Sequence, residues 1–302
     1  MGYGSYSAAD WQKLKNSRKL SNGQSVGEVF KRTECNPKMD PKFIGTRECF
    51  DSEEHPNTTP IVVGLDVTAS MGYLAVELAT GALNELITKL YSTGAVEDPA
   101  LMCAAYGDFQ DKSPLQVTQF ESDIRIAEQL VELYLEHSRI FYFENGGSGE
   151  VVPTCLWAFL ARHTNIDAIR KRKQKGFLFT IGDQANIRST SVGATIERVI
   201  GDVLPGEVTR ERILKEAEAS FHVFHIMIGR ENKGNAELLP GHCMVLDRES
   251  TACLPEIIIS TIQLQKGEAR EDVLARWDEL NRPVISAALA QLSLQADADI
   301  QL

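Results

Sequence analysis

The chain has 302 residues, of which 43% are hydrophobic and 24% are charged, as in an ordinary globular protein. Such a length allows one large α/β domain with extensions, or two small domains. Its formal net charge of −11 makes nucleic acid an unfavoured partner, because non-specific binding requires Lys and Arg to neutralise phosphates. The six cysteines form no Cys-x-x-Cys pair, which favours reduced thiols over a disulfide framework.

The start of the chain is rich in Gly, Ser and Tyr and lacks the basic and then apolar pattern of a signal peptide. No apolar run in the sequence approaches the length of a membrane span. We therefore expect a cytoplasmic protein without a membrane partner.

Residues 1–59 show weak periodicity, and prolines recur between residues 35 and 60. This pattern predicts an extended arm with short helices. We expect the arm to pack on the main domain through its apolar side chains. The acidic stretch 47–56, which contains His55, is expected to be a solvated lead-in to the first strand. The apolar side chains expected to anchor the arm are Phe30, Phe43, Ile44 and Phe50.

Residues 60–266 alternate between apolar runs of strand length and segments with helical spacing. Helical crossovers of this length require a mostly parallel sheet that is covered on both faces. The expected fold is therefore α/β and doubly wound, with a six-stranded sheet and an edge strand at residues 114–120. The other strands are expected at 61–65, 101–106, 176–181, 221–228 and 243–246, and helices at 73–91, 124–135, from 153, 191–204, 209–219 and 253–265.

Residues 267–302 are expected to form a helical extension. Two stripes of apolar side chains predict a helical hairpin packed on the domain, and a helix that binds a partner or a second copy is the alternative. The basic run 170–175 is interpreted as the end of a helix, where cations are favourable, in preference to an RNA-binding patch. The stripes of the extension are Val273, Trp277 and Leu280, and then Ile285, Leu289 and Leu292.

A polar cluster follows the first strand directly. Asp66, Thr68 and Ser70 are spaced two residues apart, and a helical pattern begins after them. Two later strands also end in an acidic residue, at Asp108 and Asp183. Parallel strands bring such ends to one edge of the sheet, where α/β proteins bind their ligands. Hydroxyl and carboxylate oxygens are hard donors that suit Mg²⁺ or Mn²⁺, with Ca²⁺ less favoured.

The order of these motifs resembles the von Willebrand factor A (vWA) domain, of the bacterial or phage intracellular type, over roughly residues 60–266. In that family an Asp-x-Ser/Thr-x-Ser loop opens a metal-ion-dependent adhesion site, a second loop adds a hydroxyl and a third adds an Asp. The resemblance implies that one metal ion is shared by Asp66, Thr68, Ser70 and Asp183.

The second loop departs from the family pattern, because it reads Gly-Gly-Ser-Gly-Glu-Val-Val-Pro-Thr over residues 146–154. The ligand from this loop could be the hydroxyl of Ser148 or of Thr154, or the carboxylate of Glu150, and Ser148 or Glu150 is favoured. Pro153 is expected to start a helix, which leaves Thr154 inside the first turn. Thr154 and Asp108 are expected to hold the metal ligands in place without contacting the metal directly.

The sequence contains no nucleophile elbow, phosphate-binding loop, zinc-protease motif or dinucleotide fingerprint. We therefore expect a binding module, not an enzyme, that recognises a partner's carboxylate through the metal. By resemblance, the partner is an AAA+ ATPase or its client, and the protein is an adaptor. The alternatives are a metal-dependent hydrolase or phosphatase that uses Asp66, and an RNA-associated vWA protein.

Overall fold

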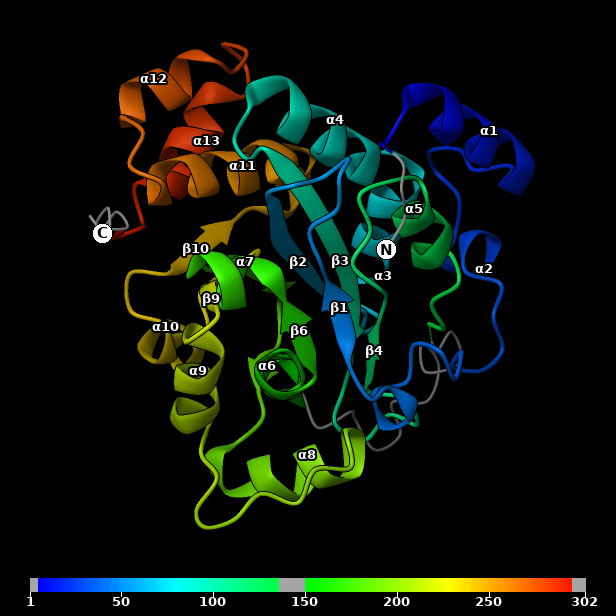
Figure 1. Ribbon diagram of the computed structural model, residues 1–302, viewed down its shortest axis with the longest axis vertical. Helices are drawn as coiled ribbons and strands as arrows, with labels where there is room; N and C mark the ends of the chain where they lie inside the picture. Colours follow the sequence, from blue (N-terminus) through cyan, green and yellow to red (C-terminus); the bar gives the residue numbers. More distant parts are fainter. Residues whose placement is uncertain (1–4, 136–149, 295–302) are drawn as a thin grey trace.

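The computed structural model describes residues 5–135 and 150–294. Its centre is a six-stranded sheet with the order β10-β9-β7-β2-β3-β4, in which all neighbours are parallel except the edge strand β4 (Figure 1). The expected doubly wound, mostly parallel sheet with its antiparallel edge strand is confirmed. The strands of this sheet are β2 (Thr58–Asp66), β3 (Asp98–Tyr106), β4 (Leu115–Val117), β7 (Gly176–Gly182), β9 (Phe221–Ile228) and β10 (Cys243–Leu246).

Both faces of the sheet are buried, which explains why its strands read as continuous apolar runs. On β2, Ile61 and Val63 enter one core and Val62 enters the other. The first core packs under helices α1, α3, α4, α5, α11 and α13, and the second packs under α6, α8 and α9 (Figure 1). No helix among the described residues is long and apolar enough to cross a membrane.

The helices lie close to the expected positions, with local differences. The helix expected at 73–91 is present, but its middle, η2, is a π-helical turn between α3 and α4. The helix expected at 124–135 ends at Leu130. The helices of the main domain are α3 (Gly72–Glu77), η2 (Leu78–Ala82), α4 (Leu83–Thr93), α5 (Arg125–Leu130), α6 (Pro153–Arg162), α7 (Asp167–Arg172), η4 (Ser189–Ser191), α8 (Val192–Val199), α9 (Arg210–Glu218), α10 (Lys233–Leu238), η5 (Arg248–Cys253) and α11 (Leu254–Gln265).

Two further two-stranded sheets were not expected from the sequence. β1 (Arg47–Cys49) pairs with β6 (Thr164–Ile166), and β5 (Glu150–Val151) pairs with β8 (Ala185–Asn186). Strands of two or three residues are too short to leave a recognisable alternation in the sequence.

The N-terminal segment contributes directly to the main core. It contains α1 (Ala8–Arg18), α2 (Val26–Val29) and η1 (Pro41–Phe43). Phe30 is fully buried and Ile44 is buried, as expected, and Phe50 is half-buried. Phe43 is 72% exposed, so its expected role as an anchor is wrong.

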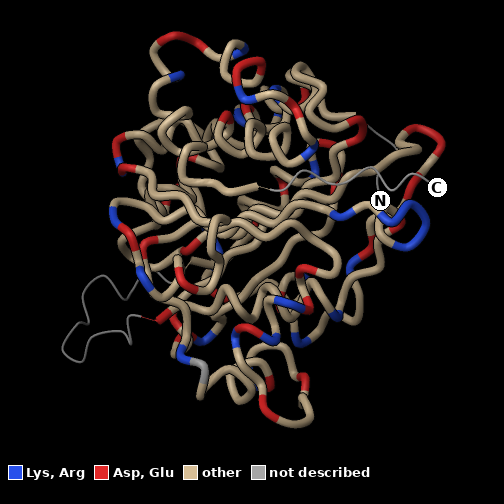
Figure 2. Tube along the Cα trace, turned by 90° about the vertical axis from the view of Figure 1, so that its left-hand side faces the viewer, with Lys and Arg blue, Asp and Glu red and all other residues tan. Residues whose placement is uncertain are grey.

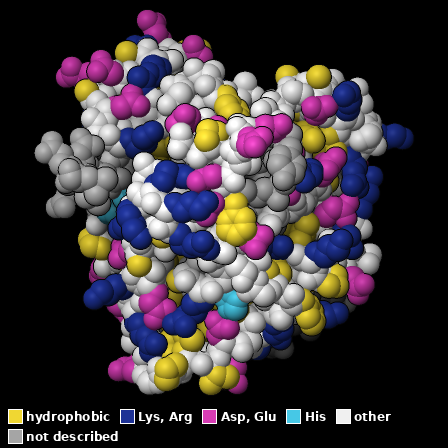
Figure 3. All heavy atoms as spheres, viewed as in Figure 1, with side chains coloured by type: hydrophobic (Ala, Val, Ile, Leu, Met, Phe, Trp, Pro, Cys, Tyr) yellow, Lys and Arg dark blue, Asp and Glu magenta, His cyan; other side chains and the backbone are white. Residues whose placement is uncertain are grey.

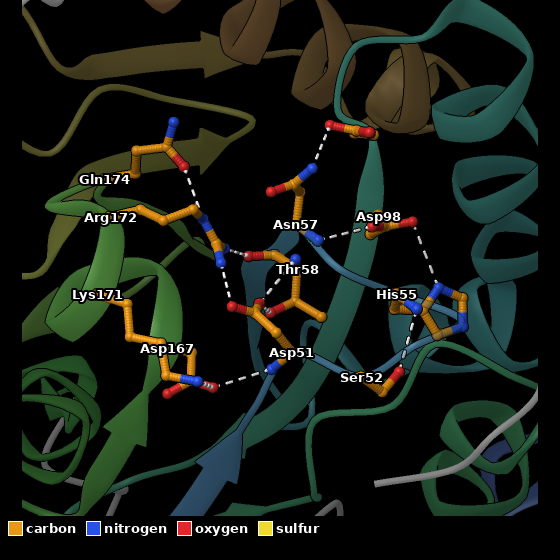
Figure 4. Close-up of polar contacts among 11 residues, drawn as sticks. Asp51, Ser52, His55, Asn57, Thr58, Asp98, Asp167, Lys171, Arg172 and Gln174 are labelled. Carbon is orange, nitrogen blue, oxygen red and sulfur yellow. Dashed lines mark hydrogen bonds and ion pairs between the residues drawn. The ribbon is translucent and has the colours of Figure 1, made fainter.

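The lead-in at residues 47–56 is held by polar contacts and is not simply solvated (Figure 4). His55 is buried, and its Nδ1 lies 3.4 Å from Asp98 Oδ1. Arg172, in the last turn of α7, pairs with Asp51 and donates to the carbonyl of Thr58 at 2.6 Å. The lead-in is therefore solvated only in part: Glu48, Glu53 and Glu54 are exposed, whereas the contacts of His55 and Asp51 join the segment to β3, to the start of β2 and to α7.

The C-terminal extension forms α12 (Arg270–Ala275) and α13 (Arg282–Leu289), which pack on α11. Trp277 is buried and donates from Nε1 to Ser260 Oγ at 2.7 Å. Ile285 and Leu289 are fully buried in the first core. Leu280 is 90% exposed and does not belong to the buried stripe, because it lies in the turn between the two helices.

The close packing between strands gives a first prediction. A Cβ at Gly176 would lie 2.7 Å from the backbone oxygen of Pro60, and backbone cannot move aside as a flexible side chain can. We expect Gly176→Ala to lower the free energy of unfolding by about 1–3 kcal/mol, as overpacking does. Thermal denaturation should show a loss of several degrees in Tm.

The matched control is Gly45→Ala, because a Cβ at Gly45 would meet no atom within 4 Å. Its Tm should stay within about 1–2 °C of the wild-type value, since it changes stability by about 0.5 kcal/mol at most. Equal melting temperatures for the two variants would contradict the strand packing described above.

Candidate metal centre

The sheet register places Asp66 at the carboxyl end of the central strand β2. Asp66 is paired in register with Tyr106 of β3, and Leu65 is paired with Ile181 of β7. The strands that lead to Asp108 and Asp183 therefore lie on either side of the strand that ends at Asp66, as expected. Parallel pairing thus brings three segments that are distant in sequence to one edge of the sheet.

Four of the expected ligands form one hydrogen-bonded cluster. Asp66 Oδ1 accepts from the backbone N–H of Thr68 at 2.9 Å and from its hydroxyl at 2.6 Å. The hydroxyl oxygens of Thr68 and Ser70 lie 3.5 Å apart. Ser70 Oγ donates to Asp183 Oδ1 at 3.0 Å, which joins the first loop to the loop after β7.

Asp66 is the most constrained member of this cluster. Its side chain is fully buried, and Oδ2 has no hydrogen-bond partner among the described residues. Burial raises the pKa of Asp66 to about 7, hydrogen bonds from Thr68 and from the backbone of Asp183 limit this rise, and the nearby Asp183 carboxylate adds to it. A buried carboxylate oxygen without a partner is costly, and a cation beside it would remove the cost.

A glycine makes room beside this oxygen. A Cβ at Gly182 would lie 2.7 Å from Asp66 Cβ and 2.9 Å from Asp66 Oδ2. Tyr106 approaches the same point and donates its hydroxyl to the carbonyl of Ile181 at 2.9 Å. Glycine at position 182 therefore leaves space at the carboxylate that any side chain would fill.

The loop that carries Asp183 is braced by a buried polar chain. Asn235 Nδ2 lies 3.3 Å from the carbonyl of Gln184, and its Oδ1 accepts from the backbone of Asn186 at 3.3 Å. Asn235 Nδ2 also contacts His225 Nε2 at 3.1 Å, and His225 Nδ1 contacts Thr180 Oγ1 at 2.9 Å. Burial lowers the pKa of His225 to about 4, so this histidine is a neutral core residue.

The second loop is only partly described. Ser148 lies outside the described residues. Glu150 is in β5 and pairs with Arg188 Nε at 2.6 Å. Thr154 is in the first turn of α6, as expected, and donates to Asn186 Oδ1 at 2.9 Å. Asp108 is buried, and its Oδ1 accepts from the backbone of Gln110 at 2.9 Å.

Arg248 is a member of the cluster that sequence reasoning missed. Its Nη2 donates to Asp183 Oδ2, and its Nη1 donates to the carbonyl of Ser70 at 3.3 Å. Arg248 begins η5, which follows the strand β10, and it is 65 residues from Asp183 in the chain. No local pattern marks this residue, since its role depends on the loop after β10 folding towards the cluster.

The donor set suits a hard divalent cation. No group of three or more His, Cys, Asp or Glu side chains with metal-binding geometry occurs within residues 5–135 and 150–294. The cluster instead offers two carboxylates and two hydroxyls, with one carboxylate oxygen buried and unpaired in the described structure. Oxygen donors of this kind fit Mg²⁺ or Mn²⁺ better than softer metals.

Comparison with known proteins gives only distant similarity. No family model and no curated protein matches the sequence. The fold is similar to the pilus adhesin SpaC from Lactobacillus rhamnosus GG in its open conformation, with 9% identity and a TM-score of 0.42 over 71% of this chain and 31% of that chain. A second structure of SpaC gives 10% identity and a TM-score of 0.43, over 74% of this chain and 32% of that one.

Proximal thread matrix protein 1 from the mussel byssus gives 11% identity and a TM-score of 0.41, over 72% of this chain and 50% of that one. The chain therefore spans half or less of the length of these structures. Similarity at this level assigns no function to the chain.

The burial of Asp66 predicts how stability depends on pH. The folded protein keeps the Asp66 proton up to about pH 7, whereas the unfolded chain releases it near pH 4. Between these values the folded state binds more protons than the unfolded state. The stability that the protonated Asp66 contributes is therefore lost as pH rises. Asn cannot titrate. The free energy of unfolding of Asp66→Asn should therefore rise by about 2–3 kcal/mol relative to that of wild type as the pH is raised from 5 to 8.

This difference is measured by urea denaturation of both proteins in the presence of chelator. Asp272→Asn is the matched control, because Asp272 is exposed on α12 and the substitution removes a carboxylate that is not buried. A pH-independent difference between Asp66→Asn and wild type would contradict the burial of an ionisable Asp66.

Proposed function

We propose that the protein is a cytoplasmic vWA-type binding module that recognises a partner's carboxylate through a bound Mg²⁺ or Mn²⁺. The observation that supports this most strongly is the cluster of Asp66, Thr68, Ser70 and Asp183, in which a buried carboxylate oxygen has no hydrogen-bond partner among the described residues. The motif order that resembles the vWA family supports the same reading. These four residues would hold the ion.

The chemistry of the cluster favours binding over catalysis. The hydroxyls of Thr68 and Ser70 are neutral donors, and the carboxylates orient them through the observed hydrogen bonds. When bound, a divalent ion with few charged ligands keeps positive charge for a further oxygen ligand. An Asp or Glu of another protein would supply that ligand.

A hydrolase is the less favoured function. Asp66, which such an enzyme would use, is fully buried and its Oδ1 accepts two hydrogen bonds from Thr68, and both ring nitrogens of the nearby His225 are engaged in the core. An RNA-binding role is also less favoured. Lys and Arg alternate with Asp and Glu along the chain (Figure 2), and Asp and Glu lie among the Lys and Arg on the face drawn in Figure 3. Within the basic run, Lys171 pairs with Asp167.

Phosphatase activity against a model ester, and RNA binding measured at several salt concentrations, test these two alternatives directly. Metal-dependent hydrolysis that is lost in Asp66→Asn would replace the binding function. The AAA+ ATPase or its client stays the proposed partner by resemblance to the vWA family.

The proposed metal site predicts a stabilisation that depends on the ion. A ligand at about a hundredfold excess over its Kd stabilises the folded state by about 2.7 kcal/mol. Millimolar Mg²⁺ or Mn²⁺ should therefore raise the Tm of the wild-type protein, and chelator should reverse the increase. Asp183→Ala should lose this response, whereas Asp272→Ala on the exposed face of α12 should keep it. A wild-type Tm that does not respond to either ion would contradict the site.

Coupling through the ion predicts how partner binding responds to two treatments. Pull-downs compare the amount of one partner retained by wild type and by Asp66→Ala, each with and without chelator. Either treatment should reduce retention to the same level, and the two together should reduce it no further, since both remove the same ion. Additive losses would show that Asp66 and the ion act separately, and retention unchanged by either treatment would contradict the metal bridge.

A further inference from the structure

We propose that Arg248 is a resident cation of the candidate metal centre, which competes with the divalent ion for Asp183 and so sets the affinity for that ion. The proposal rests on the proposed function, because it assumes that the cluster binds a metal. It adds a residue that neither the motif pattern nor the vWA resemblance assigns to the site.

The contacts of the guanidinium carry this proposal. Arg248 donates to Asp183 Oδ2, on the same carboxylate whose Oδ1 accepts from Ser70. It also donates to the carbonyl of Ser70 at 3.3 Å. The guanidinium therefore connects the loop of Ser70 with the loop of Asp183. Both residues are among the four proposed metal ligands.

The fold holds the backbone of Arg248 and leaves its side chain adaptable. Thr251 Oγ1 contacts the carbonyl of Arg248 and the carboxylate of Glu77 on α3, each at 3.1 Å. The side chain of Arg248 is 45% exposed, whereas that of Asp183 is 9% exposed. The anchored end of this ion pair is thus Asp183, and the guanidinium is the partner that can move.

The side chain of Arg248 passes over Gly229. Gly229 has a φ of +84°, and a Cβ there would lie 3.3 Å from Arg248 Nε and 3.6 Å from its Cγ. Glycine thus both adopts the left-handed backbone and lets the arginine cross it. Arg248 itself lines a surface hollow here, together with Asp183, Gln184, Ile228, Gly229, Arg230, Asp247 and Glu249.

Electrostatic repulsion would prevent the guanidinium of Arg248 and a divalent ion from binding Asp183 at the same time. A guanidinium bound to Asp183 cancels part of the negative charge that would attract a divalent ion, and two cations that share one carboxylate repel each other. Binding of the ion should therefore release Arg248 from Asp183 within the hollow, where Asp247 and Glu249 offer alternative acidic partners. Removal of the guanidinium charge should strengthen metal binding.

The first test is calorimetric titration of the purified protein with Mn²⁺. Arg248→Gln should lower the Kd for Mn²⁺ by about fivefold, the upper range for an ion pair with one partly exposed partner. Arg230→Gln is the matched control, since Arg230 lines the same hollow and its change removes the same charge. That control should change the Kd by less than about twofold. Equal Kd values for the two variants, or weaker binding by Arg248→Gln, would overturn the proposal.

The second test uses the wild-type protein, so it does not depend on how a variant folds. The Nε–H signal of Arg248 in a proton–nitrogen NMR spectrum is assigned by its loss in Arg248→Lys. This signal should shift on saturation with Mg²⁺, and an unmoved signal would overturn the competition. If Mn²⁺ binds wild type but not Asp66→Asn, and Arg248→Gln has no effect, only the role of Arg248 fails. If neither wild type nor Arg248→Gln binds Mn²⁺, both the role of Arg248 and the proposed function fail.

Discussion

The arrangement of this protein depends on the burial of one carboxylate, that of Asp66, at the carboxyl end of the central strand. An ionised carboxylate is expensive to bury unless hydrogen bonds or a cation compensate it. Thr68 satisfies one oxygen with its backbone N–H and its hydroxyl, and the other oxygen has no partner among the described residues. The absence of a side chain at Gly182 keeps space open at that oxygen. The local fold thus keeps one buried oxygen of Asp66 without a partner among the described residues, and burial favours the protonated form of this carboxyl up to about pH 7.

The surrounding structure positions the groups that share this charge. Parallel pairing of β2 with β7 brings Asp183 to Ser70, although 113 residues separate them. Asn235 and His225 brace the loop after β7 from the core side. Arg248 closes the cluster from the solvent side. The result is a cluster whose buried half is fixed by hydrogen bonds and whose outer half holds the partly exposed guanidinium of Arg248.

The sequence predicts the parts of this arrangement that depend on local pattern or on general topology. The strand before Asp66 is a continuous apolar run, the spacing of Thr68 and Ser70 is visible directly, and the contribution of Asp183 follows from the parallel sheet. Arg248 could not be predicted, because its contact depends on the path of one loop after β10. The pairing of β1 with β6 and of β5 with β8 is too short to leave a period in the sequence. Leu280 was misjudged because periodicity indicates a helix face but not where the helix gives way to an exposed turn, and Phe43 was misjudged because an apolar side chain alone does not establish burial.

The central claim is that Asp66, Thr68, Ser70 and Asp183 hold one divalent cation. The most direct measurement is X-ray diffraction from crystals grown with millimolar Mn²⁺, with data collected near the manganese absorption edge. The account predicts a single anomalous difference peak between these four side chains, at about 2.0–2.6 Å from its oxygen ligands. Manganese bound elsewhere in the crystal, with no anomalous peak among these side chains, would contradict it.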